Sequence, residues 1–264
     1  MQINFFKYEG TGNDFVIIDN RSLKFEKTNR DLITRICNPK KGVGADGLIL
    51  LENDKDLNFK MVYYNADGSE SGFCGNGSRC ITHLAKYLKI IDRDAKFKAI
   101  DGIHESKIIN GIVSVKMNDL PMNRIINYDD ERKTTFIDSG SPHLIMLCSN
   151  IDKINVVKIA GEVKSKFPQF EQGFNINFCE IDKEKIKLRT YERGVEDETL
   201  SCGTGAVATA IFLNYHNLLS NKKIDILMKG GQLTVEVTQS NEIYSNIWLS
   251  GNVNSVFSGT YNLT

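Results

Sequence analysis

The sequence lacks an excess of either charge, which limits the partners that it can bind through electrostatics alone. Lys and Arg together number 33, and Asp and Glu together also number 33. Without a basic surplus there is no reason to expect nucleic acid or an anionic membrane surface as a partner. With 41% hydrophobic and 25% charged residues the composition is that of a globular protein, and 264 residues suffice for one large domain or two of ordinary size.

Long apolar segments and paired cysteines are missing as well. No run approaches the roughly 20 apolar residues that span a bilayer, and Met1–Gly10 lacks a basic region followed by an apolar core. We therefore expect no membrane helix and no signal peptide. The six cysteines include no CxxC pair, which indicates free thiols in a reducing, cytoplasmic location. Their spacing also matches no zinc site, so no metal is expected.

What the chain does contain is one short motif twice. Cys-Gly-x-Gly occurs at Cys74 and again at Cys202, 128 residues further along a chain of 264, and a helical pattern follows each copy. Shifting the sequence by that distance aligns glycines, tyrosines and acidic residues of the two halves. The aligned pairs are Gly12 with Gly140, Asn13 with Ser141, Tyr63 with Tyr191, Glu70 with Glu198, Gly75 with Gly203, Gly77 with Gly205 and Gly102 with Gly230. This register indicates internal duplication.

Each half also has the same order of expected elements, which favours an α+β fold. Hydrophobic patterning predicts strands at 16–19, 48–52, 59–64, 144–147, 176–181 and 186–191, and helices at 29–37, 78–88, 154–166 and 206–218. Residues 96–117 and 223–256 are expected to be rich in strands. The polar segment 118–133 is the expected linker between two domains. We place these at 1–118 and 119–254, with the last residues, about 255–264, packing back on the first.

The repeated motif has a definite chemical meaning. Glycines after the cysteine let successive backbone N–H groups approach a ligand, and the following helix leaves its first four N–H groups unpaired. Such a helix start binds carboxylates and lowers the pKa of a thiol placed there. Two of them can hold one small carboxylate, with a thiol on each side of the neighbouring carbon. This pattern predicts proton removal by a thiolate on one face and delivery by a thiol on the other.

Other motifs do not support a cofactor. Gly42–Gly47 matches GxGxxG in its letters, but it follows a helix and precedes a strand, the reverse of the order in a dinucleotide site. No nucleophile elbow and no recognisable lysine motif for pyridoxal phosphate is present. We therefore expect cofactor-independent chemistry on a small molecule.

Four segments resemble motifs of the diaminopimelate epimerases. Asn65–Arg79 (NADGSESGFCGNGSR) is similar to the signature around the first catalytic cysteine of that family. Residues 191–206 resemble its second cysteine region, and 10–15 and 140–143 resemble two further motifs. The match extends from the N-terminus to residue 206.

The resemblance implies two pseudo-symmetric mixed α/β domains, each a curled sheet around a central helix, with the active site in the cleft between them. It implies interconversion of LL- and meso-diaminopimelate without pyridoxal phosphate, for lysine and peptidoglycan synthesis, by an enzyme that forms a homodimer. The implied catalytic residues are Cys74 and Cys202, assisted by His143 and Glu192. The implied substrate-binding residues are Asn13, Asn65, Gly75, Asn76, Ser141, Asn175, Glu192, Arg193, Gly203 and Thr204.

Two positions depart from the family pattern. Ser141 and Gly47 stand where relatives have amide side chains, while Asn13 and Asn175 occupy the equivalent positions of the other half. Two other interpretations of the sequence stay open. One is a related racemase of the same architecture, such as a proline-type racemase, and the other is a non-catalytic ligand-binding or thiol-redox protein. Arg79, one turn into the first expected helix, is interpreted as structural or peripheral.

Overall fold

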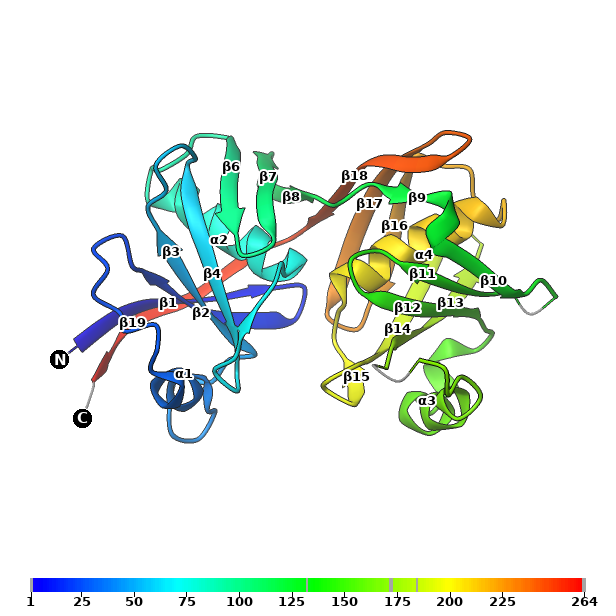
Figure 1. Ribbon diagram of the computed structural model, residues 1–264, viewed down its shortest axis with the longest axis horizontal. Coiled ribbons are helices and arrows are strands. Elements are labelled where there is room, and N and C mark those ends of the chain that lie inside the picture. Colours follow the sequence, from blue (N-terminus) through cyan, green and yellow to red (C-terminus); the bar gives the residue numbers. More distant parts are fainter. Residues whose placement is uncertain (1, 132, 171–172, 184, 263–264) are drawn as a thin grey trace. The chain divides into compact units, whose positions relative to one another are not determined.

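The computed structural model describes residues 2–131, 133–170, 173–183 and 185–262. The chain forms two compact units: unit 1 comprises residues 1–116 and 251–264, and unit 2 comprises residues 117–250. Figure 1 shows the elements of each unit by their labels. Each unit is a mixed sheet with one enclosed helix and one outer helix. The predicted fold class, mixed α/β with a duplicated unit, is therefore confirmed.

Unit 1 contains nine strands and two α-helices among its described residues. They are β1 (Gln2–Gly10), β2 (Asn13–Asp19), α1 (Arg30–Cys37), β3 (Gly47–Glu52), β4 (Phe59–Asn65), β5 (Glu70–Ser71), α2 (Gly75–Tyr87), β6 (Asp94–Ala99), β7 (Gly102–Ile109), β8 (Ile112–Lys116) and β19 (Asn254–Asn262). The last strand pairs with the first, from Gln2 opposite Asn262 to Glu9 opposite Asn254.

Unit 2 repeats the plan. It contains β9 (Leu120–Pro121), the 3₁₀ turn η1 (Met122–Arg124), β10 (Ile125–Asp129), β11 (Thr134–Asp138), β12 (Pro142–Leu147), the 3₁₀ turn η2 (Ile151–Lys153), α3 (Val156–Lys164), β13 (Asn175–Asp182), β14 (Lys185–Glu192), β15 (Asp197–Thr199), α4 (Gly203–Tyr215), β16 (Lys223–Met228), β17 (Gly231–Gln239) and β18 (Ile243–Gly251). Residues 118–133, the expected linker, thus contain β9, η1 and β10. Ile125 fills a buried position there although the segment is polar and aperiodic.

Parallel pairs explain how each helix is placed. In unit 1, β2 runs parallel to β3 and β4 parallel to β6, with α1 and α2 in the two connections. In unit 2, β12 and β13 are joined through α3, and β14 and β16 through α4. Parallel neighbours need such crossovers because their ends lie at opposite edges. Strands β2 and β3 alternate side chains between two apolar clusters, one under α2 and the other under α1.

The helices that follow the cysteines are the enclosed ones (Figure 1). On α4 nine residues, Gly205–Leu213, are buried without a break, whereas α3 buries Val156, Ala160 and Val163 on one face. Helices α2 and α4 each have 13 residues, and both begin three residues before the predicted start. The glycines mask these helix starts in a propensity pattern. In the first turn, however, they cost little because its N–H groups have no intrahelical partner.

Strand pairing tests the duplication register residue by residue. Phe15 pairs with Gly47 in unit 1, and His143 pairs with Asn175 in unit 2, each 128 residues on. The register slips by one on the next strand: Tyr64 lies opposite Glu70, and Tyr191 lies opposite Glu198.

Two predicted pairs are therefore wrong by one residue. Tyr191 corresponds to Tyr64 rather than Tyr63, because unit 2 has one residue fewer between β13 and β14 and one more before β15. Likewise Gly231, with φ of 134°, corresponds to Gly102, with φ of 138°, in place of Gly230.

Candidate functional site

The predicted site residues form two groups, one in each unit. In unit 1, Cys74 is the N-cap of α2, and the N–H of Gly77 donates to its sulfur at 3.4 Å. Gly75 and Asn76 form the first helical turn and are buried. The sulfur thus lies at the positive end of an enclosed helix, where a thiolate and a bound carboxylate are both stabilised.

Asn13 joins this first group through its side-chain oxygen. Its Oδ1 lies 3.9 Å from the Cys74 sulfur and 3.4 Å from Nδ2 of Asn76. The amide nitrogen of Asn13 donates to Oδ2 of Asp46. Asp46 was not predicted as a site residue, but its carboxylate can only accept, so it turns the Asn13 oxygen toward the sulfur.

Asn65 and Gly47 lie at the adjacent ends of β4 and β3, where they pair with each other. Nδ2 of Asn65 donates to Ser69 Oγ at 3.3 Å within a tight turn. Gly47 has a steric reason to lack a side chain, since a Cβ there would lie 2.5 Å from the Tyr63 ring and 2.6 Å from the carbonyl oxygen of Tyr64. The Tyr63 ring occupies the space that a side chain at residue 47 would need.

Arg79 is more deeply placed than the sequence suggested. Its side chain is 0% exposed, and Nη2 donates to Thr11 Oγ1 at 2.9 Å. Among the described residues, Nε and Nη1 have no hydrogen-bond partner. Burial lowers the pKa of the guanidinium. A peripheral role is therefore wrong: the side chain fastens the Thr11 loop, which carries Asn13, to α2.

In unit 2, Cys202 is the N-cap of α4 and is 8% exposed. Gly203 and Thr204 form the first turn, and the Thr204 hydroxyl lies 3.5 Å from the sulfur. The carbonyl oxygen of Thr204 accepts from Ser139 Oγ at 2.8 Å. This second thiol therefore has a hydroxyl partner where the first has the amide of Asn13.

His143 lies directly behind this hydroxyl. Its Nε2 is 2.9 Å from Thr204 Oγ1, and its Nδ1 is 2.8 Å from Nδ2 of Asn177. The imidazole is 0% exposed. Burial first, and then the positive charge of Arg193, lower the pKa of His143 to about 3. The ring is consequently neutral at physiological pH, and it supports the site through hydrogen bonds rather than as an imidazolium.

This depressed pKa predicts a loss of stability in acid. An unfolded histidine titrates near pH 6.5, so below that pH the unfolded chain binds a proton that the folded chain refuses down to about pH 3. The contribution of His143 to the free energy of unfolding should therefore fall by about 2 kcal/mol between pH 6.5 and pH 5. Urea unfolding at several pH values measures this slope. The variant His143→Gln should lack that part of the slope, and an identical slope in both proteins would contradict the assignment.

Ser141, Asn175 and Arg193 form a second contact group beside the histidine. Nδ2 of Asn175 donates to Ser141 Oγ at 2.9 Å, and Oδ1 of Asn175 accepts from the backbone N–H of Arg193 at 2.9 Å. Arg193 is exposed, and Glu192, the last residue of β14, is partly exposed. The side chains of this group present amide, hydroxyl, carboxylate and guanidinium groups, a set suited to an amino acid.

The two groups differ at equivalent positions. In the duplication register His143 corresponds to Phe15 and Asn177 to Ile49, both of which belong to the apolar cluster under α2. Sequence reasoning found His143 but missed Asn177, because one asparagine inside an apolar strand pattern suggests nothing more than a core strand. Its burial is the available signal, since a buried amide requires partners.

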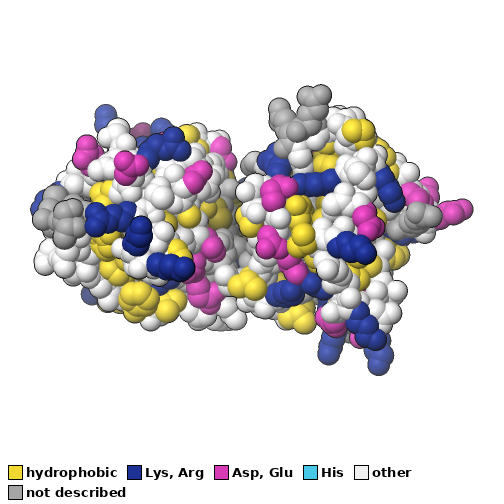
Figure 2. All heavy atoms as spheres, turned by 90° about the horizontal axis from the view of Figure 1, so that it is seen from below, with side chains coloured by type: hydrophobic (Ala, Val, Ile, Leu, Met, Phe, Trp, Pro, Cys, Tyr) yellow, Lys and Arg dark blue, Asp and Glu magenta, His cyan; other side chains and the backbone are white. Residues whose placement is uncertain are grey.

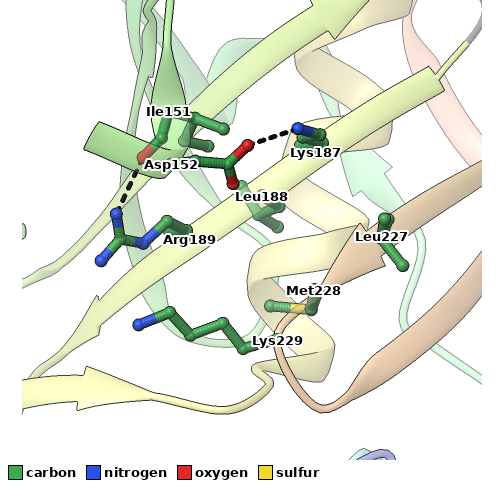
Figure 3. A pocket seen from close by; sticks show the side chains of 8 residues that line it. All are labelled: Ile151, Asp152, Lys187, Leu188, Arg189, Leu227, Met228 and Lys229. Carbon is green, nitrogen blue, oxygen red and sulfur yellow. Dashed lines mark hydrogen bonds and ion pairs between the residues drawn. The ribbon is translucent and has the colours of Figure 1, made fainter. Parts of the chain in front are cut away.

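A separate pocket in unit 2 lies away from both groups. It encloses about 320 Å³ between η2, β14 and β16, and Figure 3 shows its lining side chains. Lys187 pairs with Asp152 at 2.6 Å, while Arg189 and Lys229 both pair with Glu198, at 2.6 and 2.7 Å. Each cation of the wall is already neutralised within the unit, so this pocket offers no free charge to a ligand.

The described surface fits the balanced composition. On the face shown in Figure 2, Lys and Arg side chains share the surface with Asp and Glu side chains. Within the described residues no helix is long and apolar enough to cross a membrane. The same residues contain no cluster of three or more His, Cys, Asp or Glu that could hold a metal ion.

Comparison with known proteins gives this geometry a family. The model of the diaminopimelate epimerase family matches residues 5–118 and 135–255. The diaminopimelate epimerase of Flavobacterium psychrophilum is 44% identical over 97% of this chain and 98% of its own. That of Aquifex aeolicus is 34% identical over 97% of both chains.

Solved structures agree on the fold. A phenazine biosynthesis protein of the PhzF family from Bacillus anthracis superimposes with a TM-score of 0.77 at 14% identity, covering 100% of both chains. A hydroxyproline epimerase from Agrobacterium vitis gives 0.69 at 12% identity, covering 98% of this chain and 92% of its own. The near-complete matches in sequence show that the chain belongs to the diaminopimelate epimerase family.

Proposed function

We propose that this chain interconverts LL- and meso-diaminopimelate, using Cys74 and Cys202 as the paired acid and base. One observation carries the proposal: each unit presents a cysteine as the N-cap of its enclosed helix, at positions 74 and 202 of the same duplicated frame. A fold needs no thiol at either place. Two thiols at equivalent sites suit a reaction in which a proton leaves one face of a carbon and another arrives on the opposite face.

The proton balance is simple. One sulfur, as thiolate, removes the α-proton and becomes a thiol, while the other, as thiol, delivers its proton and becomes a thiolate. The reverse reaction exchanges their roles. Negative charge that develops on the α-carboxylate is stabilised by the N–H groups of Gly75–Asn76 and Gly203–Thr204, at the positive ends of α2 and α4.

The remaining polar residues bind the other groups of the substrate. We assign the amino and distal carboxylate groups to Asn13, Asn65, Asn175, Glu192 and Arg193, with Ser141 acting through Asn175. Arg193 is the natural partner of a carboxylate, since its guanidinium can bind two oxygens at once. The proposed setting is lysine and peptidoglycan synthesis in the cytoplasm, by a homodimer. No cofactor takes part in these steps.

Isotope exchange tests this function. The reduced protein is incubated with LL-diaminopimelate in D₂O, and NMR follows deuterium at the α-carbon while chiral chromatography follows meso product. We expect both to appear, and L-proline treated in the same way to stay unlabelled. Absence of exchange with diaminopimelate would refute the proposal. Exchange with proline alone would instead favour a proline-type racemase.

A further inference from the structure

A continuous chain of hydrogen bonds leads from the interior of unit 2 to the second thiol. Thr190 Oγ1 donates to Oδ1 of Asn177 at 2.8 Å, and Nδ2 of Asn177 lies 2.8 Å from Nδ1 of His143. Nε2 of His143 lies 2.9 Å from Thr204 Oγ1, which lies 3.5 Å from the Cys202 sulfur. Thr190, Asn177 and His143 are each 0% exposed, so bulk water does not compete for these bonds.

The direction of the chain follows from counting protons. The Asn177 oxygen is engaged by Thr190, so the NH₂ group of Asn177 faces Nδ1 of the imidazole. A neutral imidazole carries one N–H, and an Nδ1 that accepts leaves that proton on Nε2. Nε2–H then donates to the Thr204 oxygen. The hydroxyl proton of Thr204 is left for the Cys202 sulfur, which as a thiolate can only accept.

Burial and charge keep the imidazole in this neutral form. The charged groups on the facing strand are Glu192 and Arg193, which end β14, and the titratable group on α4 is Cys202 itself. Burial and the charge of Arg193 hold the pKa of His143 at about 3. A single tautomer, rather than a change of charge, is therefore what the ring contributes.

The fold does not require this chain. In unit 1 the equivalents of His143, Asn177 and Thr204 are Phe15, Ile49 and Asn76, and the first two pack in an apolar core. The same architecture is thus built with carbon at the positions where unit 2 has a buried imidazole and amide. Buried polar groups that replace an apolar solution need a reason beyond stability.

We propose that Asn177 is a positioning residue for Cys202. It fixes the Nε2–H tautomer of His143, and through it commits the Thr204 hydroxyl to donate to the sulfur, so that Cys202 is maintained as a thiolate. The role deepens the epimerase proposal and rests on it for its biological purpose. The hydrogen bonds themselves can be tested without any substrate.

The first test reads the tautomer directly. The chain has four histidines, so protein labelled with ¹⁵N-histidine gives few resonances, and His143→Gln identifies those of His143. We expect the wild-type ring to carry its proton on Nε2 between pH 5 and pH 8. In Asn177→Asp the new carboxylate can only accept, so Nδ1 should become protonated. A wild-type ring that carries its proton on Nδ1 would overturn the proposal.

The second test measures what the tautomer does to the sulfur. Alkylation of Cys202 by iodoacetamide is followed by mass spectrometry across pH, since the thiolate is the reacting form. Asn177→Leu and Thr204→Val should each slow alkylation at neutral pH about tenfold, and should move the midpoint of the pH profile up by about one unit. Thr204→Ser, which keeps a hydroxyl, should restore the wild-type profile.

A double variant shows whether Asn177 acts through Thr204. Asn177→Leu combined with Thr204→Val should react no more slowly than Thr204→Val alone. A further tenfold loss in the double variant would contradict the route. Thr209→Val is the matched control: it removes a buried hydroxyl of α4 that bonds the Gly205 carbonyl at 2.8 Å, and it should leave the profile unchanged.

The outcomes separate the two proposals. If Asn177→Leu does not fold, the wild-type spectrum and the Thr204 variants still decide the matter. If alkylation and tautomer behave as stated but no isotope exchange occurs with diaminopimelate, the proposed function fails and the positioning role stands. If exchange occurs and the tautomer is reversed, the opposite holds.

Discussion

Replacing Cys74 or Cys202 with alanine should reduce the conversion of LL- to meso-diaminopimelate by about 10³-fold, within the range contributed by a positioned acid or base. Each thiol handles one of the two protons, so neither variant can complete inversion. A further signature distinguishes this loss from misfolding. The variant that keeps Cys202 can still remove a proton from its own face and return deuterium there, giving slow exchange without inversion.

Cys148→Ala is the control for this experiment. Cys148 is a free, partly exposed cysteine outside both groups of site residues, and burial raises the pKa of its thiol to about 11. It should therefore stay protonated at neutral pH, and its removal should leave the rate within a factor of about two of wild type. Full activity in either Cys74→Ala or Cys202→Ala would refute the two-thiol mechanism, as would an equal loss in Cys148→Ala.

The sequence alone predicted the two thiols and their helices because these features are local. A cysteine, two glycines and an apolar helical stripe occupy adjacent positions, and the same order recurs 128 residues later. The outer strands were less accessible. Strand β19 pairs with β1 across about the whole length of the chain, and no local pattern reveals a partner that distant.

The supporting residues of each thiol were hidden for a different reason. Asp46 orients Asn13, and Asn177 orients His143, but both sit in segments whose pattern is explained by a turn or by a core strand. Their role depends on which way an amide points, a property of the folded site rather than of spacing. A one-residue slip at Tyr191 shows the same limit, since identical letters at a fixed shift need not share a structural position.

Duplication followed by divergence explains the asymmetry of the two groups. The helix starts are alike, so each unit can bind a carboxylate and support a sulfur. The first sulfur faces an amide oxygen, which accepts a proton from a thiol, and the second faces a hydroxyl backed by a histidine. A reversible reaction on a substrate with one free epimerising end gains from such a difference, because one resting proton arrangement is then favoured.

A methyl group added to α4 should expose this dependence most sharply. A Cβ at Gly205 would lie 2.7 Å from Oδ1 of Asn177 and 3.3 Å from the Cys202 sulfur. Asn177 is held by Thr190 and His143, so it cannot yield without breaking the hydrogen-bond chain. Gly205→Ala should therefore lower the epimerisation rate about 100-fold, the usual effect of a misplacement near 1 Å. The free energy of unfolding should drop by only about 1–3 kcal/mol.

The duplicated frame supplies the matched comparison at Gly77. A Cβ there would meet Ile49 Cδ1 at 2.9 Å, with Met61 and Phe15 at 3.4 Å, and the tips of Ile49 and Met61 can turn aside without losing a hydrogen bond. Gly77→Ala should thus cost less than tenfold in rate. Gly161→Ala on α3, where a Cβ meets nothing within 4 Å, should keep full activity and raise stability by up to about 1 kcal/mol. Equal losses at Gly205 and Gly77 would mean that crowding of the helix, rather than the polar chain behind Cys202, sets the rate.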